Sequence, residues 1–267
     1  MSKAVWAKDR SLLRLSGSDA RSLLQDLVTN DLEQLSSGLV YAALLTPQGK
    51  YLFDFFVSER DGGLLLEVAA DQAAALLARL TLYKLRADVT LETSDLAVVH
   101  GLGEAPSGAH TDPRHEALGW RLYTDDPERV VADYALLTPQ EWTELRVEHV
   151  IPETGLELQS DQSYILEMGF ERLSGVDFRK GCYVGQEVTA RMKHKTVLKK
   201  GLVAVRLTGQ GVQPGTEIVR DGKTVGEVHS VLGERGLAYV RHDRVGAGMM
   251  AGDAEVAVIE SVPKQQN

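Results

Sequence analysis

A single cysteine, Cys182, lies in the part of this sequence best suited to chemistry. Gly181 and Gly185 flank it, so the backbone there can approach a ligand closely or adopt positive φ. Lys180 precedes it, and residues 186–193 can form a helix whose N-terminus would follow the cysteine. A basic neighbour and a helix N-terminus both favour the thiolate, which is a nucleophile and a soft ligand for iron or copper. A lone cysteine is also commonly a small buried hydrophobic residue, and spacing alone leaves that alternative open.

Positive charge is concentrated around this cysteine. Residues 179–206 contain eight Lys or Arg against one acid, Glu187, and so carry +7, whereas the whole chain carries −9. The remainder of the chain therefore carries −16. A basic segment on an acidic body indicates a site for an anionic ligand or partner, and a solvated surface face is the simpler alternative. The acidic total argues against a general nucleic-acid binder.

The first two-thirds of the chain mixes strand and helix patterns. Apolar and alternating runs predict strands, and helical periodicity with capping residues predicts helices. The predicted strands are 12–15, 39–45, 51–57, 64–68, 87–91 and 96–99. The predicted helices are one with the face Leu23, Leu24 and Leu27, and then 71–82, 127–136 and 139–147, while 101–114 is a predicted loop. This order indicates an α+β body with antiparallel strand pairing.

Short strands separated by Gly-rich turns dominate the chain after Lys200. They are predicted at 202–207, 217–219, 225–232, 237–240 and 255–259. Such spacing predicts a small β-barrel or sandwich.

Composition bounds the remaining possibilities. The chain has 267 residues and no run of about 18 apolar ones, so we expect no membrane-spanning helix. Its start lacks an apolar secretory core and an Arg-rich transit pattern, and one cysteine fits a reducing compartment, so the cytoplasm is the simplest expectation. One cysteine also excludes an intramolecular disulfide and a Cys-only zinc or iron–sulfur site within one chain, and we expect no resident metal.

The segment around Cys182 resembles the signature of the YgfZ family, which is related to the T-protein, the aminomethyltransferase of the glycine cleavage system. The matching residues are Leu173-Ser174-Gly175-Val176-Asp177-Phe178, Lys180-Gly181-Cys182-Tyr183-Val184-Gly185-Gln186-Glu187 and Ala190-Arg191. A match of this length is far more specific than a short glycine pattern. Three other segments are similar to T-protein segments: 24–31, 48–54 and 145–148, the last followed by His149-Val150 where T-proteins have Ala-Gly.

The resemblance implies a particular α+β fold. It is a cloverleaf of two α+β subdomains around a central hole, followed by a small C-terminal β-barrel. The subdomains would cover roughly 1–46 with 147–198, and 47–146, so that residues 1–198 form the folate-binding region. The barrel would cover 199–262 and leave a tail at 263–267. The break near Lys200 in the strand pattern agrees with this division.

The resemblance also implies a ligand, tetrahydrofolate or another reduced folate. Glu148 matches the family position that binds the pterin, where a carboxylate accepts two adjacent N–H groups. Taken alone, Glu148 would be an exposed acid at a helix end. Lys180 and Arg191 suit the carboxylates of the folate tail. Asn30 could contact the ligand, although with Asp31 it is favoured as a cap or turn residue.

Asp54 bears on two functional alternatives. T-proteins carry a pair of acids at this point and use one to assist chemistry at the folate nitrogen, but Phe53 replaces the first acid here. Asp54 is therefore a candidate ligand contact or a residue on the polar face of a strand. The lost pair weakens the interpretation as a folate-dependent aminomethyltransferase or demethylase.

The favoured hypothesis is a tetrahydrofolate-binding accessory factor in iron–sulfur cluster assembly or repair, with Cys182 as a functional thiol. Mitochondrial relatives of the family act late in iron–sulfur cluster assembly. This implies assembly proteins or cluster enzymes as partners, and support of tRNA modification as one role. A scaffold that binds nucleic acid through the basic segment is the least favoured alternative, and we expect no membrane partner.

Overall fold

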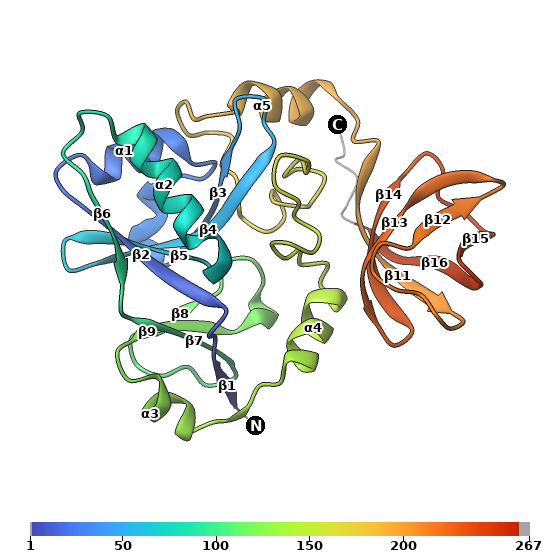
Figure 1. Ribbon diagram of the computed structural model, residues 1–267, viewed down its shortest axis with the longest axis horizontal. Coiled ribbons are helices and arrows are strands. Elements are labelled where there is room, and N and C mark those ends of the chain that lie inside the picture. Colours follow the sequence, from blue (N-terminus) through green and yellow to red (C-terminus); the bar gives the residue numbers. More distant parts are fainter. Residues whose placement is uncertain (1, 262–267) are drawn as a thin grey trace. The chain divides into compact units, whose positions relative to one another are not determined.

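The computed structural model describes residues 2–261 (Figure 1). The predicted tail 263–267 and residue 262 of the predicted barrel lie outside the described residues. The chain divides into two compact units, Met1–Pro139 with Leu173–Gln186 and Gln140–Arg172 with Glu187–Asn267. The finer division into subdomains 1–46 with 147–198 and 47–146 stays a prediction. No helix within residues 2–261 is long and apolar enough to span a membrane.

A five-stranded antiparallel sheet forms the main body of the first unit (Figure 1). Its order is β3-β4-β5-β2-β6. The strands are β2 (Arg10–Ser16), β3 (Val40–Leu45), β4 (Tyr51–Arg60), β5 (Gly63–Ala69) and β6 (Thr90–Ser94). Helices α1 (Ala20–Leu27) and α2 (Ala73–Lys84) cover one face of the sheet. Leu24 of α1 and Leu76 of α2 pack there in one core with side chains of β2, β3, β4 and β5.

Alternation along β4 places different residues on the two faces of this sheet. Phe53, Phe55 and Val57 belong to the core beneath the helices. Because successive side chains of a strand point to opposite faces, Asp54 and Phe56 lie on the face away from α1 and α2. Both are nevertheless buried, so the strand is covered on both sides.

A second five-stranded sheet completes the first unit, in the order β10-β1-β7-β9-β8. Its strands are β1 (Lys3–Trp6), β7 (Ala97–Leu102), β8 (His110–Thr111), β9 (Trp120–Thr124) and β10 (Ala135–Leu136). The unit also contains α3 (Pro127–Ala132) and the short 3₁₀ helices η1 (Leu32–Ser37), η2 (Ala70–Gln72) and η3 (Glu116–Leu118).

Two local predictions are wrong in this sheet. The helix predicted at 127–136 ends at Ala132, because Ala135 and Leu136 pair in parallel with β1. The predicted loop 101–114 contains β8, which pairs with β9. Both elements exist through strand pairing between segments that are not neighbours in a local window, so helix propensity and loop composition do not reveal them.

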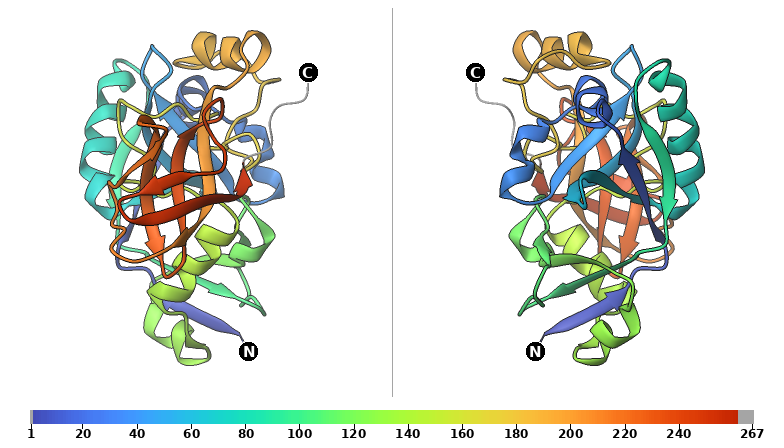
Figure 2. Two further views of the ribbon diagram at one scale, coloured as in Figure 1. Left: turned by 90° about the vertical axis from the view of Figure 1, so that its right-hand side faces the viewer. Right: turned by 90° about the vertical axis from the view of Figure 1, so that its left-hand side faces the viewer.

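A closed six-stranded barrel dominates the second unit (Figure 2). Its order is β11-β14-β13-β12-β15-β16. The strands are β11 (Lys200–Thr208), β12 (Glu217–Arg220), β13 (Lys223–Leu232), β14 (Arg235–Arg241), β15 (Met249–Ala251) and β16 (Ala254–Ser261). The predicted barrel is confirmed, and β15 is the strand that the sequence pattern missed. With three residues it is too short to show alternation.

Two helices precede the barrel in the sequence. They are α4 (Pro139–Glu148) and α5 (Gln186–Lys195), which agree with the predictions at 139–147 and 186–193. Each carries a first-turn acid, Glu141 in α4 and Glu187 in α5, which suits the positive end of the helix dipole.

Buried Glu157 ties three parts of the second unit together. Its carboxylate accepts a hydrogen bond from Arg146 Nη1 of α4 at 3.2 Å and from the Glu153 backbone N–H at 3.0 Å. The hydroxyl of Ser230, on β13, also donates to it. Arg146 and Glu157 are both almost completely buried. A buried charge is tolerated because it is paired, so this cluster fixes the irregular segment after α4 to the barrel.

Candidate functional site

The loop before α5 exposes the thiol of Cys182. The alternative of a small buried hydrophobic residue is therefore wrong. Two contacts close this loop: Gln186 Nε2 donates to the Gly181 carbonyl at 3.2 Å, and the Gln186 backbone N–H donates to the Tyr183 carbonyl at 3.2 Å. Tyr183 is buried, so it anchors the loop while the cysteine one residue earlier faces solvent.

Gly185 explains one of the two glycines beside the cysteine. It has φ +82°, and a Cβ at this position would lie 2.6 Å from the Thr46 carbonyl oxygen. Only glycine allows this close approach to the turn at Thr46–Gly49. Gly181 differs, because no atom lies within 4 Å of its hypothetical Cβ. The signature glycine at 185 is thus a packing requirement, whereas the one at 181 leaves open space beside the thiol.

Lys180 points inward, away from solvent. Its ammonium donates to the carbonyls of Gln25 at 2.6 Å, Val28 at 2.6 Å and Asn30 at 3.1 Å. These bonds occupy all three donors of the ammonium group. Burial lowers the pKa of Lys180 to about 8, although Asp31 opposes the shift. The lysine therefore holds the signature against the segment after α1, and its role as a folate contact stays a prediction.

Asn30 is fully engaged with the backbone around it. Its Nδ2 donates to the carbonyls of Tyr41 at 2.8 Å and Ser174 at 2.7 Å, and its Oδ1 accepts from the Asp31 N–H at 2.9 Å. Asp31 in turn caps η1, because its carboxylate accepts the Glu33 N–H at 3.0 Å. That N–H and the Gln25 side chain lower the pKa of Asp31. Asp31 has the cap role that the sequence favoured, whereas the Asn30 amide group donates to carbonyls distant in the sequence.

Asp54 is hydrogen-bonded to Tyr41, the residue whose carbonyl accepts from Asn30. Its carboxylate accepts from the Tyr41 hydroxyl at 2.9 Å and from the Tyr51 hydroxyl at 2.7 Å. Burial and the adjacent Asp54 carboxylate raise the pKa of Tyr41 well above its ordinary value, so its proton stays on the phenol. Hydrogen bonds within one unit therefore run from Lys180, two residues before Cys182, through Asn30 and Tyr41 to Asp54.

A buried ionic network flanks Asp54 and was not predicted from the sequence. The guanidinium of Arg114 lies 4.8 Å from the Phe56 ring centroid and 5.4 Å from that of Tyr41. It pairs with Asp112 through Nε at 3.0 Å and Nη2 at 2.8 Å, a bidentate arrangement. Burial opposes ionisation, but Arg114 and Arg121 hold the pKa of Asp112 well below its usual range.

The network continues to Glu67 of β5, which is completely buried. Arg10 donates to it at 2.8 Å, the Tyr123 hydroxyl donates at 3.0 Å, and Arg121 forms a further ion pair with it. Burial works against the charge, yet Arg121 and Arg10 together lower the pKa of Glu67. One sequence signal could have indicated this network: an acid within an apolar strand, such as Asp54 or Glu67, requires a partner when it is buried.

Two predicted folate contacts lie in the second unit. Glu148 is the last residue of α4 and is exposed. Arg191 is an exposed residue of α5. Lys193, two residues later, forms an ion pair with Glu171. Within residues 2–261, no group of three or more His, Cys, Asp or Glu side chains is arranged to hold a metal ion.

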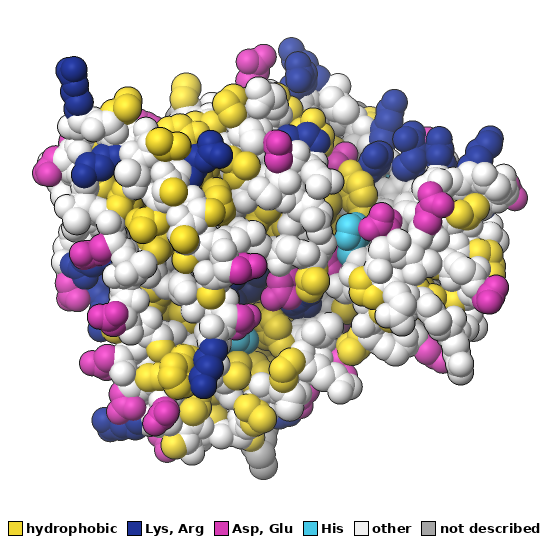
Figure 3. All heavy atoms as spheres, in the orientation of Figure 1, with side chains coloured by type: hydrophobic (Ala, Val, Ile, Leu, Met, Phe, Trp, Pro, Cys, Tyr) yellow, Lys and Arg dark blue, Asp and Glu magenta, His cyan; other side chains and the backbone are white. Residues whose placement is uncertain are grey.

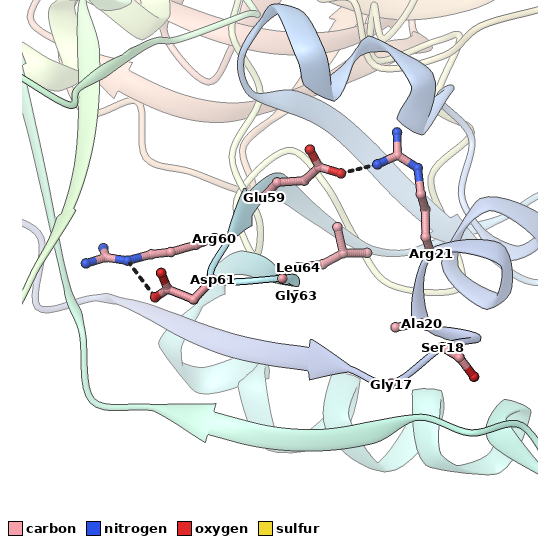
Figure 4. A pocket seen from close by; sticks show the side chains of 10 residues that line it. Gly17, Ser18, Ala20, Arg21, Glu59, Arg60, Asp61, Gly63 and Leu64 are labelled. Carbon is pink, nitrogen blue, oxygen red and sulfur yellow. Dashed lines mark hydrogen bonds and ion pairs between the residues drawn. The ribbon is translucent and has the colours of Figure 1, made fainter.

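A separate cavity of about 430 Å³ opens in the first unit between the start of α1 and the β4–β5 turn (Figure 4). None of the predicted site residues lines it. Its charged side chains already pair with one another, Arg21 with Glu59 and Arg60 with Asp61. The cavity therefore offers mixed and mutually satisfied charge rather than a site for one class of ligand.

Two relatives match nearly the whole chain, and a family model matches its barrel region. The iron–sulfur cluster assembly factor IBA57, mitochondrial, of Mus musculus is 32% identical over 295 residues, an alignment that covers 95% of this chain and 82% of the relative. Its Homo sapiens counterpart is 32% identical over 303 residues, covering 97% and 85%. The family model described as CAF17, C-terminal beta-barrel domain, matches residues 199–264.

A solved structure shares the fold of this chain over most of its length. The glycine cleavage system aminomethyltransferase T from Bartonella henselae superposes with a TM-score of 0.73 at 13% identity, covering 98% of this chain and 86% of that one. The expected T-protein-like α+β fold with a C-terminal β-barrel is thereby confirmed. The expected cytoplasmic location is wrong by the sequence comparison, because both relatives are named as mitochondrial proteins. Folate binding, the YgfZ subtype and the link to tRNA modification stay predictions.

Proposed function

The chain belongs to the IBA57 family of iron–sulfur cluster assembly factors, and on that premise we propose that it is a tetrahydrofolate-binding accessory factor whose working thiol is Cys182. The observation that carries the proposal is the exposed thiol, in a loop that a hydrogen bond from Gln186 to Gly181 closes and that buried Lys180 and Tyr183 anchor. Such a thiol is accessible to a partner but confined in position, which suits ligand exchange rather than structural packing.

The thiol would bind an iron–sulfur cluster that is transferred between proteins. A deprotonated Cys182 would attack one iron of a cluster carried by another protein, forming an Fe–S bond as one cysteinyl bond to the donor breaks. The proton lost by Cys182 would balance the one gained by the released donor thiolate. One cysteine supplies one ligand, so the remaining ligands must come from the partner, glutathione or a second copy of the chain.

The predicted folate contacts fit a reduced folate in part. The exposed carboxylate of Glu148 is available to accept the two adjacent N–H groups of a pterin. Asp54 is buried, and both of its oxygens already accept tyrosine hydroxyls, so its contact with a folate is the less direct part of the proposal. When bound, a folate would supply a one-carbon carrier, and Glu148 would orient its pterin.

Replacement of Cys182 by Ser tests the thiol. In cells that lack the native protein, the variant should fail to restore cluster-dependent enzyme activities while accumulating to normal levels. Gly181→Ala is the matched control, because an added Cβ there meets no atom within 4 Å, and it should restore activity. Full activity of the serine variant would remove the thiol from the proposal.

Folate titration tests the ligand. Tetrahydrofolate should bind the wild type and lose at least about tenfold in affinity in Glu148→Ala, since a bidentate charge-assisted contact disappears. Glu144→Ala, one turn earlier on α4 and also exposed, should bind normally. Unchanged affinity in both variants would refute the contact. Turnover of an aminomethyl or N-methyl donor to methylenetetrahydrofolate would favour the alternative activity instead.

A further inference from the structure

In the structure, some cations of the basic segment at residues 179–206 are buried or paired, and others are exposed. Lys180 is buried against backbone carbonyls, and Lys193 pairs with Glu171. Four cations remain on α5, on its connection to β11 and at the start of β11: Arg191, Lys195, Lys199 and Lys200. We call these four residues the basic ridge. They lie in the second unit and belong to one continuous stretch of chain.

Geometry brings the members of the basic ridge together. Arg191 and Lys195 are four residues apart on α5 and so share one helix face. Arg191, Lys195 and Lys199 are exposed, and none of the three forms an ion pair with an acid anywhere in residues 2–261. Lys200 opens β11, opposite Arg241 of β14, whose charge is paired with Asp243. Figure 3 shows Lys and Arg side chains gathered along the edge formed by α5 and the barrel.

An exposed apolar residue lies among the cations of the basic ridge in the sequence. Val197 connects α5 to β11 and leaves 73% of its surface open to solvent. It falls between Lys195 and Lys199 in the chain, so an apolar side chain is bordered by cations on both sides. An apolar centre with a charged border is the composition of a protein-docking surface.

We propose that the basic ridge with Val197 docks an acidic segment of a partner protein, in which carboxylates surround an apolar side chain. The inference rests on the proposed function, because an assembly factor must meet the protein that delivers or receives the cluster. The charges are complementary, and complementarity of this kind raises association rates and selects partners. The basic ridge also begins nine residues after Cys182, so the docking segment and the thiol belong to neighbouring parts of the sequence.

The same features disfavour extended polyanions. Residues 191–200 contain no Phe, Trp or Tyr on which unpaired bases could stack. Outside residues 179–206 the chain carries −16, which would repel a nucleic acid or an anionic membrane larger than the basic ridge itself. A short acidic segment of a protein can contact the basic ridge without contacting the acidic remainder of the chain.

Binding of a defined probe by the full chain tests the proposal. The probe is a fluorescent synthetic peptide in which glutamates surround a leucine, measured by anisotropy. Affinity should fall about tenfold between roughly 50 mM and 300 mM salt. Lys195→Glu with Lys199→Glu should lower it at least about tenfold at low salt, and Val197→Ser about fivefold.

A matched surface provides the control. Arg79 of α2 and Arg86 just after the helix are exposed cations, and Leu82 and Leu85, which lie between them in the sequence, are also highly exposed. Arg79→Glu with Arg86→Glu changes the net charge equally and should leave peptide binding intact. An equal loss in this control would overturn the proposal. So would equal binding of a peptide with Gln for Glu, or tighter binding of single-stranded RNA or phosphatidylserine vesicles.

The two proposals fail separately. The variant with Lys195→Glu and Lys199→Glu should bind tetrahydrofolate as the wild type does, and Cys182→Ser should bind the peptide as the wild type does. Loss of peptide specificity with intact folate binding and thiol dependence would reject the docking surface alone. Loss of the thiol and folate effects with intact, salt-sensitive peptide binding would reject the proposed function and leave the surface.

Discussion

The Lys180 ammonium lies 2.6 Å from the Val28 carbonyl oxygen, so the signature lysine faces inward two residues before an exposed cysteine. Two further carbonyls complete its shell. This contact changes what the signature means physically. Its lysine fastens the loop to the body of the first unit, and its cysteine is what remains accessible.

Lys180→Met should therefore destabilise the first unit. Three buried carbonyls would lose their donor, at a cost of about 2–4 kcal/mol in the free energy of unfolding. Urea denaturation followed by tryptophan fluorescence measures this. Lys195→Met, which removes an exposed lysine, should change stability by no more than about 0.5 kcal/mol.

The effect of Lys180 should also depend on pH. Burial lowers its folded-state pKa to about 8, below the roughly 10.4 of an unfolded lysine. Between these values the unfolded chain binds more protons, so this group adds stability as pH rises from about 8 to about 10.4. The stability gap between wild type and Lys180→Met should widen across that window and stay constant below about pH 7. A gap that narrows with rising pH would contradict the assigned environment.

Gly185→Ala should strain the signature loop, whereas Gly181→Ala should not. At 185 the new Cβ would sit 2.6 Å from a carbonyl oxygen at φ +82°, and at 181 it would meet nothing within 4 Å. We expect a loss of about 2 kcal/mol or more in unfolding free energy at 185, and a change within about 0.5 kcal/mol at 181. Thermal unfolding of the two variants side by side measures the contrast. Equal stability would mean that the loop relaxes freely.

Local patterns predicted the elements that carry this site better than the contacts between them. Helix α5, the turn at Thr46–Gly49 and the apolar strand β4 follow from capping residues, turn chemistry and apolar runs, which act within a short window. The inward direction of Lys180 depends on three carbonyls about 150 residues away in the chain. No window contains that information.

The buried ionic network also depends on contacts that a short sequence window cannot predict. An acid inside the apolar run of β4 indicates that Asp54 needs partners, but not that they are Tyr41 and Tyr51. Arg114 comes from a stretch predicted as loop, and only the pairing of β8 with β9 places its neighbourhood. The sequence analysis left Asp54 as a ligand contact or a residue on the polar face of a strand, and only the tertiary structure shows that it is buried beside this network.

Glu157→Gln should unfold the second unit more readily than Glu153→Gln. Glu157 is fully buried between Arg146 and Ser230, whereas the Glu153 side chain is 37% exposed while pairing with the same arginine. Loss of the buried charge should cost about 3–5 kcal/mol, and loss of the outer one at most about 1 kcal/mol. Chemical denaturation of both variants tests the difference. Similar small losses would show that Arg146 does not need the inner carboxylate.

Acid stability should depend on Glu67. Burial raises the pKa of this carboxyl, but Arg121 and Arg10 outweigh it and the net shift is downward. A carboxyl with a lowered folded pKa contributes stability that is complete above its unfolded pKa of about 4.3 and is lost as pH falls through the folded value. Glu67→Gln should therefore cost about 3–5 kcal/mol at pH 7 and flatten the fall in stability below about pH 4. The exposed Glu92→Gln should keep the wild-type acid profile, which urea midpoints between about pH 3 and pH 7 would measure. An unchanged acid limb in Glu67→Gln would mean that other carboxyls, rather than the Arg10–Glu67–Arg121 cluster, control unfolding in acid.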